Sequence, residues 1–126
     1  MTENKAKKKI LVIEDRKPMA KALAIKLERA GFAPQVAEDG EEAIKFLQDN
    51  SFDLALLDLV LPKMDGFTIL AEIKTRNIKT PVIILSNLSQ EEDERRAKEL
   101  GAIDYLVKSE TSINEVVERV KKTLNV

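Results

Sequence analysis

Four short apolar runs in this sequence are each followed at once by side chains that could do chemistry. Glu14 and Asp15 follow the first of these runs, Asp58 follows another, and Ser86 and Lys108 follow the last two. Grouped carboxylate oxygens suit Mg²⁺, which is often bound together with phosphate oxygens. An ammonium and a hydroxyl can stabilise charge on a phosphoryl group, and a carboxylate such as Asp58 can form an acyl phosphate. These residue types predict a magnesium and phosphate site.

The residue types that are missing narrow the chemistry further. The sequence has no histidine and no cysteine, which excludes an imidazole general base, a thiolate metal site and a disulfide framework. Lys and Arg number 21 against 22 Asp and Glu, a formal net charge of -1, so we expect no direct nucleic-acid partner. The first apolar run is too short for a signal peptide or a membrane span. We therefore expect a cytoplasmic protein without a membrane partner.

The length of 126 residues fits one domain, and 44% hydrophobic with 34% charged residues is the balance of an ordinary globular chain. Lysines crowd the start of the sequence, where a solvated tail is the usual outcome. We expect a basic flexible tail over residues 1–8 and one folded domain over residues 9–126.

Apolar runs alternate with amphipathic stretches along the whole chain, which predicts strand and helix in turn. The strands are apolar at successive positions, so both faces of the sheet would be apolar and covered by helices, as in a parallel sheet between two helix layers. Such a chain is too short for an eight-fold barrel and indicates an α/β fold with one doubly wound, five-stranded parallel sheet and five helices. The expected strands are 10–13, 32–37, 54–57, 82–85 and 104–107, and the expected helices are 17–30, 41–49, 67–75, 90–100 and 113–124.

Local signals at the element ends support these boundaries. Glycines just past two helices predict left-handed caps, and two serine–glutamate pairs have the spacing of a capping box. A further Asp-Gly pair after a proline is typical of a turn. The residues are Gly31 and Gly101 for the glycine caps, Ser89 with Glu92 and Ser112 with Glu115 for the boxes, and Asp65-Gly66 after Pro62 for the turn. In a doubly wound sheet the strands' carboxyl ends form the site, which is where the side chains named at the outset stand.

Four segments at these strand ends resemble the response-regulator receiver family of two-component signalling, the CheY-like family, over essentially the whole chain. They are Ile10-Leu-Val-Ile-Glu-Asp15, Leu56-Leu-Asp-Leu-Val-Leu-Pro-Lys-Met-Asp-Gly66, Pro81-Val-Ile-Ile-Leu-Ser86 and Gly101-Ala-Ile-Asp-Tyr-Leu-Val-Lys108. The resemblance implies a flavodoxin-like sheet with strand order 2-1-3-4-5. It also implies that Asp58 is the phosphoacceptor, and that Glu14, Asp15, Asp58 and the backbone carbonyl of Val60 hold Mg²⁺, or Mn²⁺ in its place.

The same resemblance implies a switch built around the phosphoryl group. Ser86 and Lys108 would bind phosphoryl oxygens, and Ser86 would move toward the group while the ring of Tyr105 turns inward. The surface of the fourth helix, fifth strand and fifth helix would report the change. Since the chain has the length of one domain, we expect a stand-alone receiver, and the resemblance implies that it takes its phosphoryl group from a sensor histidine kinase or phosphotransfer protein. We expect a downstream protein target, with phosphorylation-driven homodimerisation left open, and no enzyme activity beyond its own phosphorylation and dephosphorylation.

The sequence departs from the commonest family pattern around the site. Glu14 stands where aspartate is usual, and its extra methylene would let its carboxylate hold a metal-bound water from farther away. Ser109 stands where proline usually follows the lysine, often with a cis bond. A cis bond before serine would cost about 2.5–4 kcal/mol, so we expect a trans bond and a reshaped loop that puts the direction of Lys108 at issue. Asn87 replaces a very small residue, and with Val60 and Leu88 beside it we hypothesise slow loss of the phosphoryl group, because water lacks an orienting side chain.

Three other readings compete. A pseudo-receiver would keep the fold and act as an interaction module without phosphate, which Ser109 and Asn87 leave open. A haloacid-dehalogenase-like phosphatase also uses an aspartyl phosphate, but that class typically has a second acid two residues on, where this sequence has Val60. DNA binding has no segment left to carry it once the five helices are assigned, so we expect output through a partner surface.

Overall fold

The structure is a computed structural model that describes residues 6–126. Five parallel strands form one sheet in the order β2-β1-β3-β4-β5, as the family resemblance implied. The strands are β1 (Lys9–Ile13), β2 (Ala33–Ala37), β3 (Leu54–Leu57), β4 (Val82–Ser86) and β5 (Asp104–Val107). The helices are α1 (Lys17–Arg29), α2 (Gly40–Asp49), α3 (Gly66–Thr75), α4 (Glu91–Glu99), the short 3-10 helix η1 (Lys108–Glu110) and α5 (Ile113–Leu124).

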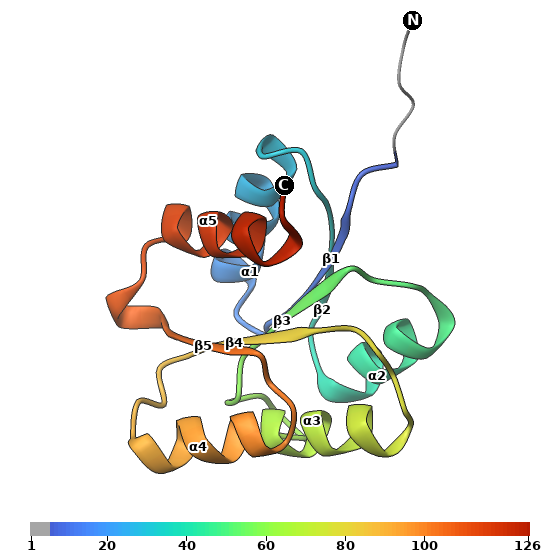
Figure 1. Ribbon diagram of the computed structural model, residues 1–126, viewed down its shortest axis with the longest axis vertical. Helices are drawn as coiled ribbons and strands as arrows, with labels where there is room; N and C mark the ends of the chain where they lie inside the picture. The colour runs from blue at the N-terminus through green and yellow to red at the C-terminus, as the bar shows by residue number, and fades with distance from the viewer. Residues whose placement is uncertain (1–5) are drawn as a thin grey trace, which may run out of the picture.

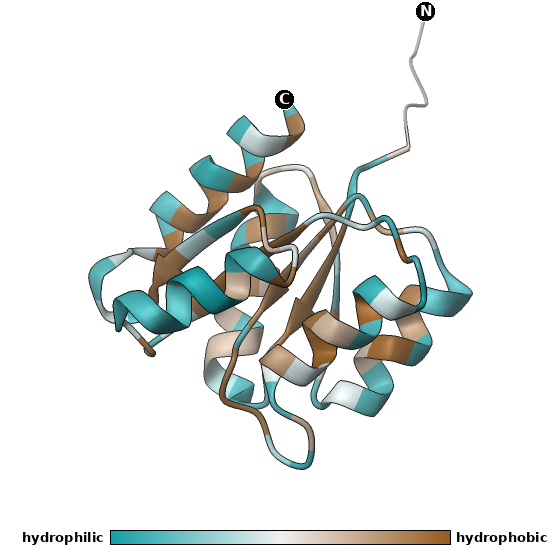
Figure 2. Ribbon diagram, turned by 60° about the horizontal axis from the view of Figure 1, so that its bottom comes forward, coloured by the Kyte–Doolittle hydropathy of each residue, from teal (hydrophilic) through white to brown (hydrophobic). Residues whose placement is uncertain are grey.

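Helices cover both faces of the sheet, with α1 and α5 on one side and α2, α3 and α4 on the other (Figure 1). The alternation of side chains along β1 shows why: Ile10 and Val12 pack in the cluster with α1 and α5, whereas Leu11 and Ile13 pack in the cluster with α2 and α3. Apolar positions gather on the inner sides of the helices and along the central strands (Figure 2). Burial on both faces is why the strands are continuously apolar up to their ends.

Three of the four predicted helix caps are confirmed. Gly31 and Gly101 have positive φ angles of 98° and 110°, a conformation that favours glycine. Ser112 and Glu115 form the predicted capping box at the start of α5. The box predicted for Ser89 is wrong, because α4 begins at Glu91 with Gln90 as its N-cap and no side-chain cap bond.

The loop before α4 explains that shift. The backbone of Leu88 is held by two side chains: its N–H donates to Ser86 Oγ at 3.3 Å, and its carbonyl accepts from the hydroxyl of Tyr105 at 2.5 Å. The helix then starts one residue too late for Ser89 to cap it. Asp65 is likewise an N-cap and not only a turn residue, since its side chain accepts from Thr68 N–H at 2.9 Å at the start of α3.

The remaining element boundaries lie within about one residue of the predicted ranges, and only η1 has no predicted counterpart. Of the predicted tail, residues 1–5 lie outside the described residues, and residues 6–8 are exposed without regular structure. Within residues 6–126, none of the helices has the length and apolar character that crossing a membrane requires.

Candidate functional site

Three acidic side chains meet at the carboxyl end of the sheet, as the topology requires. Glu14 and Asp15 follow β1 and Asp58 follows β3, and these two strands are adjacent. One carboxylate oxygen from each of the three side chains lies within 4.8 Å of the others. Glu14 and Asp58 are buried, with exposed fractions of 2% and 6%, and Asp15 is the least buried of the three. The structure therefore brings together the three carboxylates that were predicted as metal ligands.

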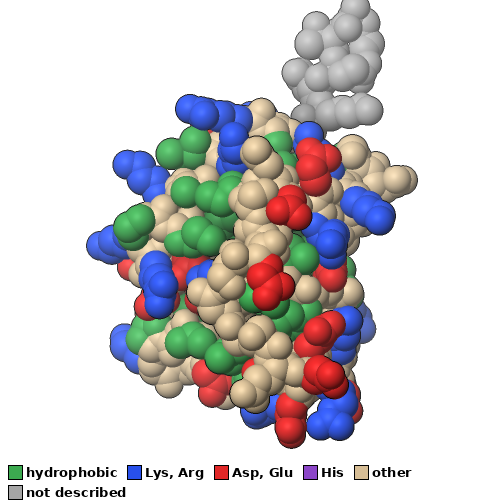
Figure 3. Space-filling model, turned by 90° about the vertical axis from the view of Figure 1, so that its left-hand side faces the viewer, with side chains coloured by type: hydrophobic (Ala, Val, Ile, Leu, Met, Phe, Trp, Pro, Cys, Tyr) green, Lys and Arg blue, Asp and Glu red, His purple; other side chains and the backbone are tan. Residues whose placement is uncertain are grey.

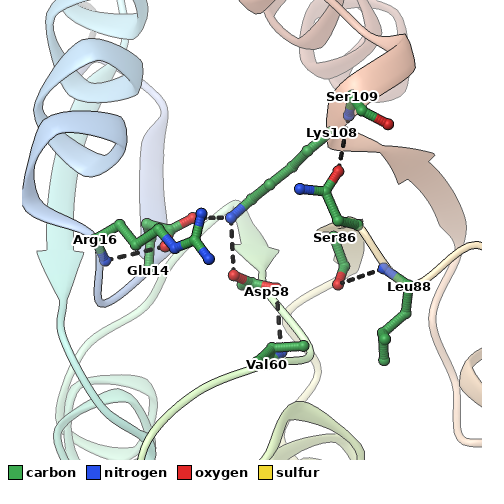
Figure 4. Close-up of polar contacts among 9 residues, drawn as sticks. Glu14, Arg16, Asp58, Val60, Ser86, Leu88, Lys108 and Ser109 are labelled. Atoms are coloured by element: carbon green, nitrogen blue, oxygen red, sulfur yellow. Dashed lines mark hydrogen bonds and ion pairs between the residues drawn. The ribbon is translucent and has the colours of Figure 1, made fainter.

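Lys108 joins the two buried acids. Its Nζ lies 2.5 Å from Glu14 Oε1 and 2.8 Å from Asp58 Oδ2, and its side chain is only 9% exposed (Figure 4). Burial by itself would lower the pKa of Lys108, but the hydrogen bonds to Asp58 and Glu14 outweigh burial and hold that pKa above its ordinary value. The lysine is thus a positive charge held at the carboxylate of Asp58.

The replacement of proline by Ser109 does not turn Lys108 away from the site. The described residues contain no cis peptide bond, as expected for the serine, and the chain enters η1 directly at Lys108. The doubt raised by the sequence about the direction of the lysine is resolved by its contacts with Asp58 and Glu14.

Backbone groups orient the carboxylates. Asp58 Oδ1 accepts from the N–H of Val60 at 3.1 Å, and Glu14 Oε2 accepts from the N–H of Arg16 at 3.1 Å. The backbone N–H of Asp58 donates to the carbonyl of Ile13 at 3.1 Å, which ties the two loops together. Both oxygens of Asp58 are therefore engaged, one by an amide and one by an ammonium.

Ser86 and Tyr105 lie on the other side of the site. Ser86 is fully buried at the end of β4, and its hydroxyl oxygen faces the N–H of Leu88. The Tyr105 hydroxyl donates to the carbonyl of the same residue, Leu88. Burial raises the pKa of Tyr105 to about 12, with further contributions from the negative charges of Asp93, Glu94 and Asp58.

An open hollow of about 140 Å³ leads to Asp58 and is lined by residues from four strand ends. Val60 is 56% exposed at its rim, in keeping with the prediction that an apolar side chain flanks the site. The lining residues are Asp15, Arg16, Asp58, Val60, Asn87 and Lys108.

Three roles were not predicted from the sequence. Arg16 lines the hollow, although a single arginine after an acid pair carries no signal of its own. A Cβ atom on Gly66 would lie 2.6 Å from Leu59 Cα and 2.7 Å from the carbonyl oxygen of Asp58, so this glycine permits a close approach of α3 to the backbone of Asp58 and Leu59. Asn87 Oδ1 accepts from the N–H of Ser109 at 2.9 Å, a contact between positions too far apart in the sequence for a pattern to reveal.

Comparisons with known proteins agree with this geometry. The family described as response regulator receiver domain matches residues 10–121. The chain is 38% identical over 117 residues to the alkaline phosphatase synthesis transcriptional regulatory protein PhoP of Bacillus subtilis, covering 93% of this chain and 48% of that protein. It is also 38% identical over 120 residues to the gliding motility regulatory protein of Myxococcus xanthus, covering 93% of this chain and 15% of that protein. The chain thus spans about half or less of these curated relatives.

Solved structures give the same result. The receiver domain of the Francisella response regulator 1452 superposes with a TM-score of 0.88 at 36% identity, covering 94% of this chain and 97% of that one. A CheY-like receiver domain protein from Methanospirillum hungatei JF-1 has a TM-score of 0.89 at 23% identity, covering 95% of both chains, which shows the shared fold.

Proposed function

This chain belongs to the response regulator receiver domain family, and from that premise we propose that it is a Mg²⁺-dependent switch that takes a phosphoryl group on Asp58. The observation that carries the proposal is the position of Lys108 Nζ, which lies within hydrogen-bond distance of both Asp58 and Glu14 in a buried site. A buried lysine held between two buried carboxylates is costly to maintain for stability alone. It supports a role in handling negative charge at Asp58.

The donor set fits Mg²⁺. Three carboxylates face one ammonium within the cluster, so the site has a surplus of negative charge and offers oxygen ligands without nitrogen or sulfur. Glu14, Asp15, Asp58 and the backbone carbonyl of Val60 would hold the ion, and Mn²⁺ would suit the same ligands. When bound, the ion would supply positive charge for the oxygens of the incoming phosphoryl group.

The chain's own residues account for the remaining steps. A carboxylate oxygen of Asp58 attacks the phosphorus of the donor, the bond from phosphorus to the donor's leaving group breaks, and an acyl phosphate forms. Lys108 neutralises charge on a phosphoryl oxygen, and the hydroxyl of Ser86 donates to another. The donor we propose is the phosphohistidine of a sensor histidine kinase or phosphotransfer protein.

The output of the switch follows from the contacts of Leu88. Movement of Ser86 toward the phosphoryl group would break the hydrogen bond between the Leu88 N–H and the Ser86 hydroxyl. The carbonyl of the same residue, Leu88, accepts the hydrogen bond from the Tyr105 hydroxyl, so the movement would also affect Tyr105. The change would pass to the surface of α4, β5 and α5. Figure 3 shows the left-hand side of the molecule as drawn in Figure 1, where hydrophobic side chains lie among charged ones. We propose that a downstream protein, or a second phosphorylated copy of the chain, reads this surface.

Incubation with acetyl phosphate and Mg²⁺, followed by intact mass measurement, tests the proposal. The native chain should gain the mass of one phosphoryl group, whereas Asp58→Asn should gain none and keep the native circular dichroism spectrum. Absence of any gain in a folded native chain would reject phosphoacceptance and leave the pseudo-receiver reading. A gain in Asp58→Asn equal to that of the native chain would place the phosphoryl group elsewhere.

A further inference from the structure

A single hydrogen bond connects the two loops that carry Ser86 and Lys108. The backbone N–H of Ser109 donates to Asn87 Oδ1 at 2.9 Å. Asn87 directly follows Ser86 at the end of β4, and Ser109 directly follows Lys108 at the start of η1. We call this contact the 87–109 bond.

Packing does little to hold the backbone of the segment that carries Lys108. The side chain of Lys108 reaches into the buried site, but Ser109 and Glu110 are exposed. The bond that closes the turn of η1, from Thr111 N–H to the carbonyl of Lys108, is long at 3.4 Å. The ammonium of Lys108 must nevertheless stay within hydrogen-bond distance of Asp58. The bond from Ser109 N–H to Asn87 is shorter, at 2.9 Å, and Asn87 directly follows the fully buried strand β4. This bond is therefore well placed to fix the backbone next to Lys108.

The two partners of this bond are two of the three positions at which the sequence departs from the family pattern. Proline at position 109 would have no N–H to donate, and a very small residue at 87 would have no side-chain oxygen to accept. Each departure alone leaves a polar group without this partner, but together the two form one contact. They are matched changes rather than separate defects of the site.

We propose that Asn87 is a positioning residue that fixes Lys108 through the backbone of Ser109 and makes the loops after β4 and β5 move together. The inference rests on the proposed function, because Lys108 acts on the phosphoryl group of Asp58. It assigns to Asn87 a role other than obstructing water. When the loop after β4 moves toward the phosphoryl group, the segment that holds Lys108 then moves with it.

The test is a double-mutant cycle on the rate of phosphoryl gain from acetyl phosphate with Mg²⁺, using Asn87→Ala, Ser109→Pro and the double variant. Asn87→Ala removes the acceptor and Ser109→Pro removes the donor. Each should slow the gain about two- to tenfold, which is what one hydrogen bond of ordinary net strength corresponds to. The double variant should be no slower than the slower single variant, since both remove the same contact. Ser109→Ala keeps the N–H and should react at the native rate.

Two further readouts separate positioning from simple stability. The exchange of the Ser109 amide hydrogen, followed by NMR in the unphosphorylated protein, should become faster in Asn87→Ala. The thermal midpoint should change little, because the bond is exposed. The inference would be overturned if the double variant gained the phosphoryl group more slowly by the product of the two single factors. A native rate of gain in Asn87→Ala would overturn it as well.

The remaining outcomes distinguish this inference from the proposed function. If the native chain gains phosphoryl mass but Asn87→Ala changes only the rate of its loss, Asn87 is a barrier to water and not a positioning residue. If the native chain gains no mass, the proposed function itself fails, and the role of Asn87 fails with it. Unchanged exchange of the Ser109 amide in Asn87→Ala would reject the bond directly, whatever the phosphorylation result.

Discussion

The two sides of the site are built differently. On one side, Lys108 contacts Glu14 and Asp58 at 2.5 and 2.8 Å, and all three side chains are at least nine-tenths buried. On the other side, Ser86 meets Leu88 through a longer contact of 3.3 Å, and the helix that follows, α4, buries only Ala97. Desolvated ion pairs hold Asp58 in place, whereas the other side is held by hydrogen bonds between uncharged groups, from Leu88 N–H to Ser86 at 3.3 Å and from Tyr105 to the Leu88 carbonyl at 2.5 Å. A fixed acceptor beside a side held without ion pairs is the arrangement that the proposed switch needs.

The largest effect should come from removing the charge that holds the acceptor side together. Lys108→Met leaves two buried carboxylates without their cation, and we expect a loss of about 3 kcal/mol in the free energy of unfolding at neutral pH. Urea denaturation measures the loss, and added Mg²⁺ should restore part of it. Lys98→Met is the matched control: its half-exposed pair with Glu94 should contribute at most about 0.5 kcal/mol. Equal losses in the two variants would contradict the contrast between the two sides.

Crowding the backbone behind the acceptor should have the next largest effect. Gly66→Ala places a methyl group 2.6 Å from Leu59 Cα, and backbone atoms have little room to yield. We expect a loss of about 2 kcal/mol in the free energy of unfolding and slower phosphorylation of Asp58. Thr68→Ala, two residues further along α3 and exposed, serves as the control. Native stability in Gly66→Ala would show that the acceptor loop is not as fixed as its contacts indicate.

A change at the open rim should alter kinetics without altering the acceptor. Val60 is exposed at the hollow and offers no group to orient a water molecule. Val60→Glu supplies a carboxylate there, and we expect loss of the phosphoryl group at least about tenfold faster. The measurement is the decay of phosphorylated protein after the donor is removed. Val60→Leu should decay like the native chain, and a native half-life of seconds would reject the hypothesis of slow loss.

The smallest effect concerns the hydroxyl on the switch side. Tyr105 has its pKa raised to about 12, mainly by burial, against 10.0 when unperturbed. Because the folded state holds the proton more tightly than the unfolded state, the stability from this group is complete below pH 10 and is lost as pH rises toward 12. Absorbance at alkaline pH reports this tyrosine alone, since the sequence has one tyrosine and no tryptophan. Tyr105→Phe should remove the titration, and a midpoint near 10 in folded protein would contradict the half-buried position of Tyr105.

The fold and the acceptor side were largely predictable because their signals are local. Apolar runs fix the strands, and the residues directly after those runs must meet at one edge of a parallel sheet, which places Glu14, Asp15, Asp58 and Lys108 together. The switch side was less predictable. The start of α4 is decided by contacts of Leu88 with Ser86 and Tyr105, and not by the capping-box spacing of Ser89.

Close approach and cross-loop contacts also escaped the sequence patterns. The need for glycine at position 66 comes from the backbone of Leu59 and Asp58, which only the folded chain brings near. The pairing of Asn87 with Ser109 joins two loops whose separation in sequence has no period to detect. Considered separately, Ser109 predicted a reshaped loop at Lys108 and Asn87 an obstacle to water. In the fold the two residues contact each other.

The coupling between the two sides is tested most directly by the emission of Tyr105, the one fluorescent side chain besides phenylalanine, during phosphorylation. Acetyl phosphate and Mg²⁺ are added to the native chain and to Asp58→Asn, with intact mass followed in parallel. Emission of the native chain should change at the same rate as its mass, and Asp58→Asn should show neither change. Full phosphorylation of the native chain with unchanged Tyr105 emission would contradict the account, because the acceptor would then react without moving the switch side.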